Sequence, residues 1–492
     1  MRKKTLAPIS LVVTVLLALM TVSPVLGQDP DPDEAEFLRD LNAGAGAAAL
    51  ARNGGAGKTS FRNDPRTQNL HPLGESFEAG SLSPFIANSD LAFWGDLAFA
   101  GRYDGFRVID ISAPGNPKEV AQVICNGNQG DVAIWGNILV RAVDRPQALP
   151  NNDLSRACEG TDTPIGVTGF EGLQIFVADD WRTVTAANLV KAVPTDCGAH
   201  THTLVPDLAH NRLIVYVSVA GSAAFAGPTP YGTSCAPLHP RIVAVEIPLD
   251  NPAAAHVVNN NIPAGINGCH DAAVHLGVNR LVGACRPTVI VWDISDPVNP
   301  VQLYATTAPG PTSWHSASLT WDGKVLVMGW EPGGGGRPRC LPTGAVDPVG
   351  NVVQTDEMKS LFFFDAANGA LLGKWTLPRP QTLTENCTIH NYNVVPLRDR
   401  YVLVHGSYQS GTSVVDFTDP AHAVEVAWVD PLPIDPNVLV LGGVWSSYWY
   451  NGFIYEHDIL EGVRVYNLSD NVTAGARKFD HLNPQTQEEI ID

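Results

Sequence analysis

The chain has 492 residues and a formal net charge of −19. At about 150 residues per domain, this length suggests about three domains. Charged residues make up 16% of the chain, against about 25% in an average domain, while apolar residues make up 45%, so disorder throughout the chain is excluded. The negative charge would repel a phosphate backbone and an anionic membrane, which excludes nucleic acid as an expected partner. The 45 glycines and 38 prolines, without a Gly-X-Y period, indicate a turn-rich β protein.

The N-terminus has the pattern of a cleaved signal peptide. Arg2, Lys3 and Lys4 precede an apolar run at 11–20, which is half the length that spans a bilayer, and small residues follow up to Gly27. We therefore expect residues 1–27 to be removed and the mature protein to be secreted, with no membrane span. Residues 28–67 are rich in Ala, Gly and Asp and predict a flexible leader, with at most a short helix at 33–41.

Three segments look like copies of one unit: 106–117 (FRVIDISAPGNP), 289–300 (VIVWDISDPVNP) and 412–420 (TSVVDFTDP). Each is an alternating strand that ends in an acidic residue and continues into a turn with proline. Weaker copies end at Val177, Glu246, Asp365 and Asn467, which gives seven copies. The aligned acids are expected to accept local backbone N–H groups at the turns, and they are Asp110, Glu246, Asp293, Asp365 and Asp416.

Apolar hairpins precede the repeats. Their turns have Gly or Asn at positions that need positive φ, as in Trp94-Gly95-Asp96 and Trp135-Gly136-Asn137. A fourth strand follows each copy, for example at 118–123 and 301–305. Four short antiparallel strands in seven copies predict an all-β fold, a seven-bladed β-propeller over residues 68–475, which replaces three domains with one.

The last blade lacks an obvious fourth strand of its own. The segment 69–77 has strand character, and we expect it to complete this blade and close the ring. The segment 476–482 is the competing candidate, and otherwise residues 476–492 are expected to form a polar C-terminal tail.

The VIDIS-x-P-x-NP segments resemble the LVIVD-repeat family of secreted or cell-surface bacterial and archaeal β-propellers. The resemblance extends over about residues 68–470 and is strongest at the three copies quoted above. It implies a propeller in an extracellular setting, and it implies no particular biochemical role.

The long insertions all fall between the second and third strands of a blade. They are 145–171, 221–240 and 331–358, and this position puts them on one face of the propeller. Insertions confined to one face of a repeat scaffold usually mark the binding face. The alternative is neutral drift in loop length.

The eight cysteines are predicted to lie on this same decorated face, either before first strands or after second strands. In an exported chain an even number of cysteines indicates disulfides. Pairing within blades gives Cys125–Cys158, Cys197–Cys235 and Cys269–Cys285, and it leaves Cys340 to meet Cys387 across two blades.

Four successive blades have a histidine at the start of the first strand. Counting back from the second strand places His202, His270, His315 and His390 in one register at the mouth of the central channel. Imidazole nitrogens suit divalent Zn, Cu, Fe or Ni, so the four could converge on one transition metal ion. The arrangement is similar in outline to metalloenzymes of the carotenoid oxygenase type, although none of that family's sequence motifs is present.

Other residues are candidates for the same channel mouth. His200 lies two residues before His202, and Asp271 and Asn391 follow their histidines, where they could fix an imidazole tautomer. The alternative is that these polar residues belong to the repeat itself and bond to neighbouring blades. The triplet 456–458 (Glu-His-Asp) could be catalytic, but we expect it to be a solvated strand end.

Three function classes stay open at this level. The first is a binding scaffold whose decorated face takes an extracellular protein, a glycan or a small ligand. The second is a metal-dependent enzyme, an oxidoreductase or a hydrolase, with a histidine cluster at the channel mouth. The third is a structural extracellular module. The sequence names neither a ligand nor an oligomeric state.

Overall fold

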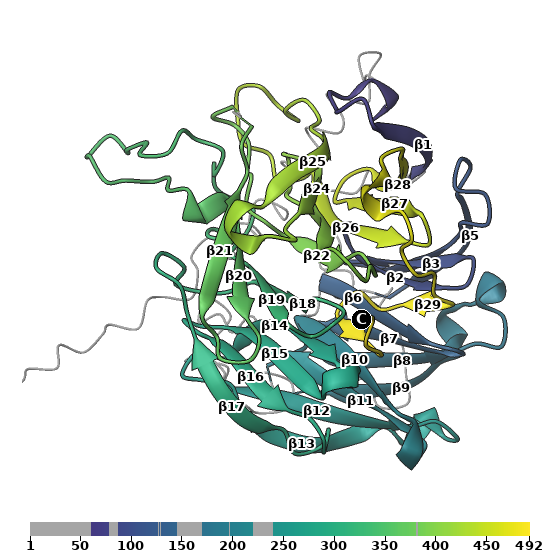
Figure 1. Cartoon of the computed structure of the whole chain (residues 1–492). Coiled ribbons are helices and arrows are strands. Elements are labelled where there is room, and N and C mark those ends of the chain that lie inside the picture. The colour runs from purple at the N-terminus through teal and green to yellow at the C-terminus, as the bar shows by residue number, and fades with distance from the viewer. Residues whose placement is uncertain are drawn as a thin grey trace, which may run out of the picture.

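The computed structural model describes residues 61–77, 87–125, 127, 129–144, 170–195, 197–219, 240–379 and 382–492. Within these ranges the regular elements are strands and short 3-10 helices. The sheets follow one another around a common centre, as in a β-propeller (Figure 1). No helix in these ranges is long and apolar enough to cross a membrane. The predicted signal peptide and most of the leader lie outside the described residues.

Consecutive strands form antiparallel groups of four. The first two groups are β2 (Asn88–Trp94), β3 (Leu97–Arg102), β4 (Gly105–Asp110) and β5 (Lys118–Ile124), then β6 (Gln129–Trp135), β7 (Ile138–Val143), β8 (Gly172–Val177) and β9 (Leu189–Pro194). The next two are β10 (Thr201–Asp207), β11 (Arg212–Ser218), β12 (Arg241–Pro248) and β13 (His256–Pro263), then β14 (Cys269–His275), β15 (Arg280–Cys285), β16 (Val289–Asp293) and β17 (Val301–Thr306).

Two more groups follow, and a last set of three strands completes the order. They are β18 (Ser316–Leu319), β19 (Val325–Gly329), β20 (Ser360–Asp365) and β21 (Leu371–Thr376), then β22 (Asn391–Val394), β23 (Val402–Gly406), β24 (Thr412–Asp416) and β25 (Val424–Val429), then β26 (Val444–Tyr450), β27 (Phe453–Asp458) and β28 (Gly462–Leu468). The outer edge of β28 pairs antiparallel with β1 (Leu70–Phe77), from Leu70 opposite Leu468 to Phe77 opposite Gly462.

Burial falls from the first to the fourth strand of a group. The first strand β6 is buried except at Trp135, whereas the fourth strand β17 has no fully buried residue. Apolar cores lie between neighbouring groups, and one such core packs Val140 and Ile175 against Val215 and Val245. First strands have continuous apolar runs because neighbouring groups cover both of their faces. Fourth strands have a mixed pattern because they are partly exposed.

The turns follow the expected chemistry. Gly95 and Gly136 have φ values of 55° and 59° in the hairpins that join first to second strands. At the ends of third strands, the Asp110 carboxylate accepts the Ser112 N–H at 2.9 Å, and the Asp293 carboxylate accepts the Ser295 N–H at 2.8 Å. Asp365 and Asp416 accept the N–H two residues further on in the same way. The local structural role is confirmed for these four acids, whereas Glu246 instead accepts from the Arg212 side chain at 2.6 Å.

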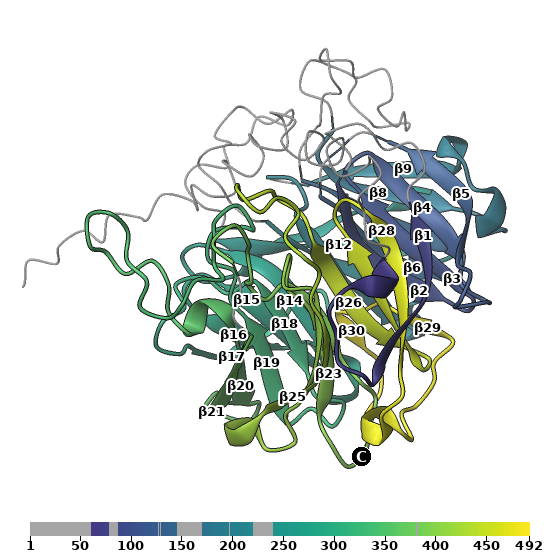
Figure 2. The same ribbon diagram turned by 90° about the horizontal axis from the view of Figure 1, so that it is seen from above.

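The C-terminal segment crosses the centre of the propeller on the side of these hairpins (Figures 1 and 2). Its strands β29 (His481–Leu482) and β30 (Thr486–Gln487) pair with β2 and, in parallel, with β14. Between them, the Asn483 side chain accepts the Ile134 N–H at 2.8 Å and donates to the Ile134 carbonyl at 2.9 Å, as a strand neighbour would. The tail therefore satisfies polar backbone groups of first strands that no blade neighbour reaches.

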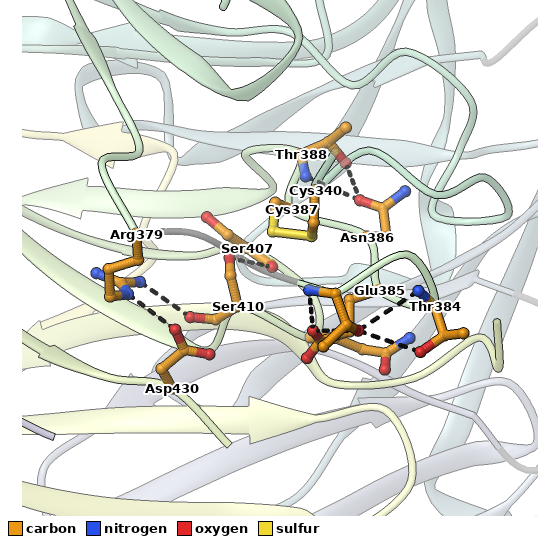
Figure 3. Close-up of a disulfide and its surroundings, with 12 residues drawn as sticks. Cys340, Arg379, Thr384, Glu385, Asn386, Cys387, Thr388, Ser407, Ser410 and Asp430 are labelled. Atoms are coloured by element: carbon orange, nitrogen blue, oxygen red, sulfur yellow. Dashed lines mark hydrogen bonds and ion pairs between the residues drawn. A yellow bond between two sulfur atoms is a disulfide. The ribbon is translucent and has the colours of Figure 1, made fainter. Parts of the chain in front are cut away.

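Two of the predicted disulfides, Cys269–Cys285 and Cys340–Cys387, are present. Figure 3 shows the second, which ties the 331–358 insertion to the segment before β22. Nearby, Arg379 donates to Asp430 at 2.9 Å and to the Ser410 carbonyl at 3.1 Å, which fixes the same edge of the propeller. Cys125 and Cys197 are also disulfide-bonded. Their predicted partners, Cys158 and Cys235, lie outside the described residues.

The two hydrogen bonds of Asn483 predict a measurable effect on stability. An Asn483→Ala variant leaves both Ile134 backbone groups buried and unpaired, so the free energy of unfolding should fall by about 1–3 kcal/mol in urea denaturation. The exposed Asn437 provides the control, because Asn437→Ala should leave the unfolding midpoint in place. Equal stability of the Asn483→Ala and wild-type proteins would show that the two Asn483 hydrogen bonds do not stabilise the fold.

The remaining cysteine pairing can be tested by peptide mapping. Digestion under non-reducing conditions should yield linked peptides that join Cys125 to Cys158 and Cys197 to Cys235, in addition to the two described pairs. The reason is that an inserted loop returns to the blade from which it leaves. A linked peptide that joins Cys125 to Cys197 would contradict this scheme.

Candidate functional site

A small polar cavity of about 40 Å³ lies where the first strands begin, at the end of the channel opposite the C-terminal tail. This volume holds one or two water molecules or an ion with part of its shell. The residues that line it come from several groups of strands and from the loops between them. They are Gln129, His200, His270, Arg286, Ser313, Trp314, His315, Glu331, Gly334, His390, Tyr408 and Trp445.

Four histidines form a continuous row along this cavity. The ring centroids are 4.3 Å apart between His200 and His270, 4.2 Å between His270 and His315, and 4.3 Å between His315 and His390. All four side chains are buried. The row begins beside β10 and ends beside β22, so each of four consecutive groups of strands contributes one imidazole.

Backbone register explains the row. The N–H groups of His200, His315 and His390 each donate to the carbonyl of the last residue of the adjacent second strand, at 2.9, 3.0 and 3.0 Å. His270 reaches the row in another way, because the pairing of β14 with β15 has an irregularity between Cys269 and Asp271. A bulge of this kind re-aims the side chain of the extra residue.

The sequence register places His202 in the row, and here the structure differs. Strand β10 pairs regularly with β11 through His202, which lies opposite Val217. Without a bulge, its side chain faces away from the cavity, and its Nδ1 lies 3.0 Å from Asp131 Oδ2. His200 takes the place in the row, with its Nδ1 3.3 Å from Asp144 Oδ2. Counting residues back from the hairpin fails because β14 contains an extra residue between Cys269 and Asp271, whereas β10 contains none.

Asp271 and Asn391 do not orient the histidines that precede them. The Asp271 carboxylate accepts the Ala272 N–H at 2.7 Å, and the Asn391 side chain donates to Asp90 Oδ2 at 3.2 Å. Both residues belong to a buried polar network inside the channel, which also contains Asp90 and Asp131. The contacts of Asp271 and Asn391 therefore agree better with the alternative that these residues belong to the repeat and bond to neighbouring blades than with a role at the channel mouth.

Glu331 is a site residue that the sequence analysis missed. It begins the loop after β19, and its carboxylate lies 3.4 Å from His315 Nε2 and 3.8 Å from His390 Nε2. The Tyr408 hydroxyl donates a short hydrogen bond to the same carboxylate. Its position in the sequence could have indicated this role, because Glu331 is the first residue of an insertion that begins at the channel mouth.

His270, His315 and Glu331 form a set that can bind a metal. Each offers one ligand atom, and the three atoms lie within 4.8 Å of one another. Within the described residues, Nδ1 of His270 and Nδ1 of His315 are buried and have no hydrogen-bond partner. Buried polar atoms without a partner are costly, so these two nitrogens are available to a group that is not part of the protein.

The electrostatics of the cavity favour the neutral form of three of its imidazoles, those of His270, His315 and His390. Burial, and then the neighbouring imidazoles, hold the pKa values of His270 and His315 well below the usual range. Burial likewise lowers the pKa of His390 to about 3. His390 Nδ1 lies 2.6 Å from the Trp445 carbonyl and donates to it, which leaves Nε2 as an acceptor. Neutral imidazole with a fixed tautomer is the form that binds a metal.

The triplet at the end of β27 is buried, so the prediction of a solvated strand end is wrong. Glu456 and His457 have no exposed surface, and Asp458 is 5% exposed. Arg464 lies 3.1 Å from Glu456 Oε1 and 3.6 Å from Asp458 Oδ2. These ion pairs hold the interior of the last group of strands together, away from the row of histidines.

Comparisons with known proteins add little to this description. No family model and no curated protein matches the chain. Solved structures that are similar include the WD40 β-propeller domain of Doa1, with a TM-score of 0.47 and 10% identity over 82% of this chain and 98% of that chain. A chain of a mitotic checkpoint complex has a TM-score of 0.48 and 11% identity, covering 84% of this chain and 97% of that one.

A third similar structure is the computationally designed Ika8 protein, with a TM-score of 0.40 and 12% identity over 80% of this chain and 99% of that chain. Likeness at these levels carries no argument about function. The assignment of a β-propeller follows from the strand pairings themselves, and none of these comparisons shows the LVIVD-repeat family.

Burial of neutral histidines outside the cavity predicts how stability depends on pH. His405 in β23 is buried, and burial lowers its pKa to about 3. The unfolded chain binds this proton near pH 6.5, so the contribution of His405 to stability is complete above about pH 6.5 and is lost as the pH falls toward 3.

A His405→Gln variant should be less stable than wild type at neutral pH, because it loses packing against Trp375 and the 2.9 Å hydrogen bond with Ser407. The deficit should shrink below pH 6.5 by up to about 1.4 kcal/mol per pH unit, measured by urea denaturation. Thr388→Val removes a buried polar group that does not titrate, so its deficit should stay constant. A constant deficit for both variants would contradict a neutral His405.

Proposed function

We propose that this protein is a metal-dependent enzyme that holds one divalent transition metal ion at the mouth of its propeller channel. His270, His315 and Glu331 would be the ligands, with His390 and His200 on either side of them. The observation that carries the proposal is the convergence of three ligand atoms within 4.8 Å beside two buried imidazole nitrogens that have no partner in the described chain.

Two histidines and one carboxylate are a common ligand set for catalytic metals. Such a set holds zinc in hydrolases and iron in oxygenases, and in both it leaves coordination positions open for water or substrate. A metal in such a site polarises a bound oxygen or lowers the pKa of bound water. The proposed reaction is therefore either a hydrolysis or an oxidation, and the identity of the bound metal would decide which.

The setting of this site is also part of the proposal. We infer that the seven groups of strands are blades of one ring, which β1 closes as the outer strand of the last blade. The pairing of β1 with β28 supports this closure. Export through a signal peptide at 1–27 and membership of the LVIVD-repeat family are proposals that depend on the sequence patterns. The two described disulfides are compatible with an extracellular location.

A binding scaffold is the second candidate function, and one described feature favours it. The 331–358 insertion projects from the propeller in both views (Figures 1 and 2). Near its tip Val346, Val349 and Val352 are 58%, 82% and 58% exposed. Apolar side chains at a projecting loop tip suit contact with an extracellular protein. The other two insertions lie almost wholly outside the described residues.

Metal binding provides the test of the first candidate. Protein that is stripped of metal and titrated with Zn²⁺ or Co²⁺ should bind close to one equivalent. His315→Ala and His270→Ala should each weaken this binding by more than about tenfold, because each removes a ligand from a set of three. Calorimetry with Zn²⁺ and the visible spectrum of Co²⁺ report the affinity and the ligand field.

Two histidine variants serve as controls. His422→Ala removes an exposed histidine on a distant turn, and His202→Ala removes a buried histidine outside the row. Neither should change the stoichiometry. If no variant alters metal binding, the metal centre is refuted and the scaffold becomes the leading candidate. If His202→Ala alone abolishes binding, the assignment of His270, His315 and Glu331 as ligands is wrong.

A further inference from the structure

Arg286 is a cationic side chain on the wall of the same cavity. It follows β15 directly and lines the cavity together with His200, His270 and His315. Its backbone N–H donates to the Gly268 carbonyl at 3.0 Å, which fixes the chain at this point. The residue is half-buried.

The guanidinium of Arg286 forms neither a hydrogen bond nor an ion pair with any described residue, in contrast to other buried or half-buried arginines. Arg102 lies 3.0 Å from Asp104, and Arg212 lies 2.6 Å from Glu246. Arginine presents five donors in a rigid fork, and a fork that is partly withdrawn from water normally has an acceptor.

The one acid that lines the cavity is already engaged. Glu331 faces His315 and His390, accepts from Tyr408, and does not reach Arg286 within 4.0 Å. Among the lining residues Arg286 is also the only lysine or arginine. An anion that enters the cavity would therefore meet one fixed positive charge.

We propose that the cavity binds a small monocarboxylate or dicarboxylate substrate, with one carboxylate on Arg286 and a second oxygen toward the metal. This inference rests on the proposed metal site. The planar fork of arginine matches a carboxylate in a bidentate pair. The Ser313 hydroxyl and the Gln129 amide line the same cavity and can donate to the substrate. Trp314 and Trp445 provide apolar walls for a short carbon chain.

Carboxylate is favoured over phosphate on two grounds. A carboxylate places both of its oxygens on the fork of one arginine, whereas phosphate has further oxygens that Arg286, the only lysine or arginine of the lining, does not also reach. The volume of about 40 Å³ is enough for a carboxylate group, with the remainder of the substrate directed to the opening. Phosphate is therefore the anion that the test must compare.

The test uses the full-length protein loaded with Co²⁺ and titrated with oxalate, with inorganic phosphate and with neutral oxamide. Wild type should bind oxalate with a shift of the cobalt spectrum, and it should bind phosphate and oxamide at least about tenfold more weakly. In Arg286→Gln the oxalate affinity should fall about tenfold or more, while the Co²⁺ affinity stays within about twofold of wild type.

Two further variants make the result specific. Arg286→Lys keeps the charge and loses the fork, so it should recover only part of the affinity. Arg398→Gln removes an exposed arginine in the loop between β22 and β23 and should behave as wild type. Circular dichroism of each variant confirms that it is folded.

The outcomes separate this inference from the proposed function. Equal oxalate affinity in wild type and Arg286→Gln, with Co²⁺ bound in both, overturns the carboxylate site and leaves the metal site intact. Tighter binding of phosphate than of oxalate also overturns it. If Co²⁺ does not bind, oxalate binding to the metal-free protein is measured by calorimetry. Oxalate binding by wild type that is lost in Arg286→Gln would then support the anion site without the metal.

Discussion

The polar centre of the channel is the constraint on which the rest of this structure depends. Asp90 on β2 accepts hydrogen bonds from Tyr448, from Asn391 at 3.2 Å and from Gln485 at 2.9 Å. One carboxylate thus joins the first group of strands to the sixth, the seventh and the C-terminal tail. Burial, and then the nearby charge of Asp131, raise the pKa of Asp90 to about 7. A buried carboxyl group is stable in such a place only when its hydrogen bonds are complete, so the centre fixes these groups of strands and the C-terminal tail relative to one another.

The site at the channel mouth is a consequence of the same geometry. First strands converge on the axis, so residues at their starts lie close together although they are far apart in sequence. This convergence brings the rings of His200, His270, His315 and His390 to successive distances of about 4.3 Å. Repetition alone would supply only imidazoles. The loop that begins at Glu331 adds a carboxylate, and the segment after β15 adds Arg286, so the irregular parts of the chain give the repeated scaffold its chemistry.

How much of this could be predicted from the sequence depends on whether the signal is local. The hairpins with Gly95 and Gly136 and the turns after Asp110 and Asp293 are set by residues a few positions apart, and the strands around them are where the patterns place them. The bulge between Cys269 and Asp271 leaves no comparable mark, because it depends on the packing of neighbouring strands. One undetected extra residue was enough to exchange His200 for His202. The place of the tail was equally hidden, since its partners are backbone groups such as those of Ile134, which have no sequence signature.

The two ends of the channel differ, and burial at one of them favours the neutral form of His270, His315 and His390. At one end Asn483 and Gln487 occupy backbone groups of β6 and β18, and the tail covers the hairpin side of the axis. The polar network beneath the histidines is joined by the protein's own hydrogen bonds, such as those that Asp90 accepts. The cavity lies at the opposite end of the axis from the tail. Burial lowers the pKa of His390 to about 3, and the charge of Arg286 acts on an anion over a longer distance in such a place than it would in water. The hydrogen bonds of Asn483, Gln485, Thr486 and Gln487 go to Asp90 and to backbone groups of first strands, none of which lines the cavity, so the tail acts on the site only through the strands that carry it.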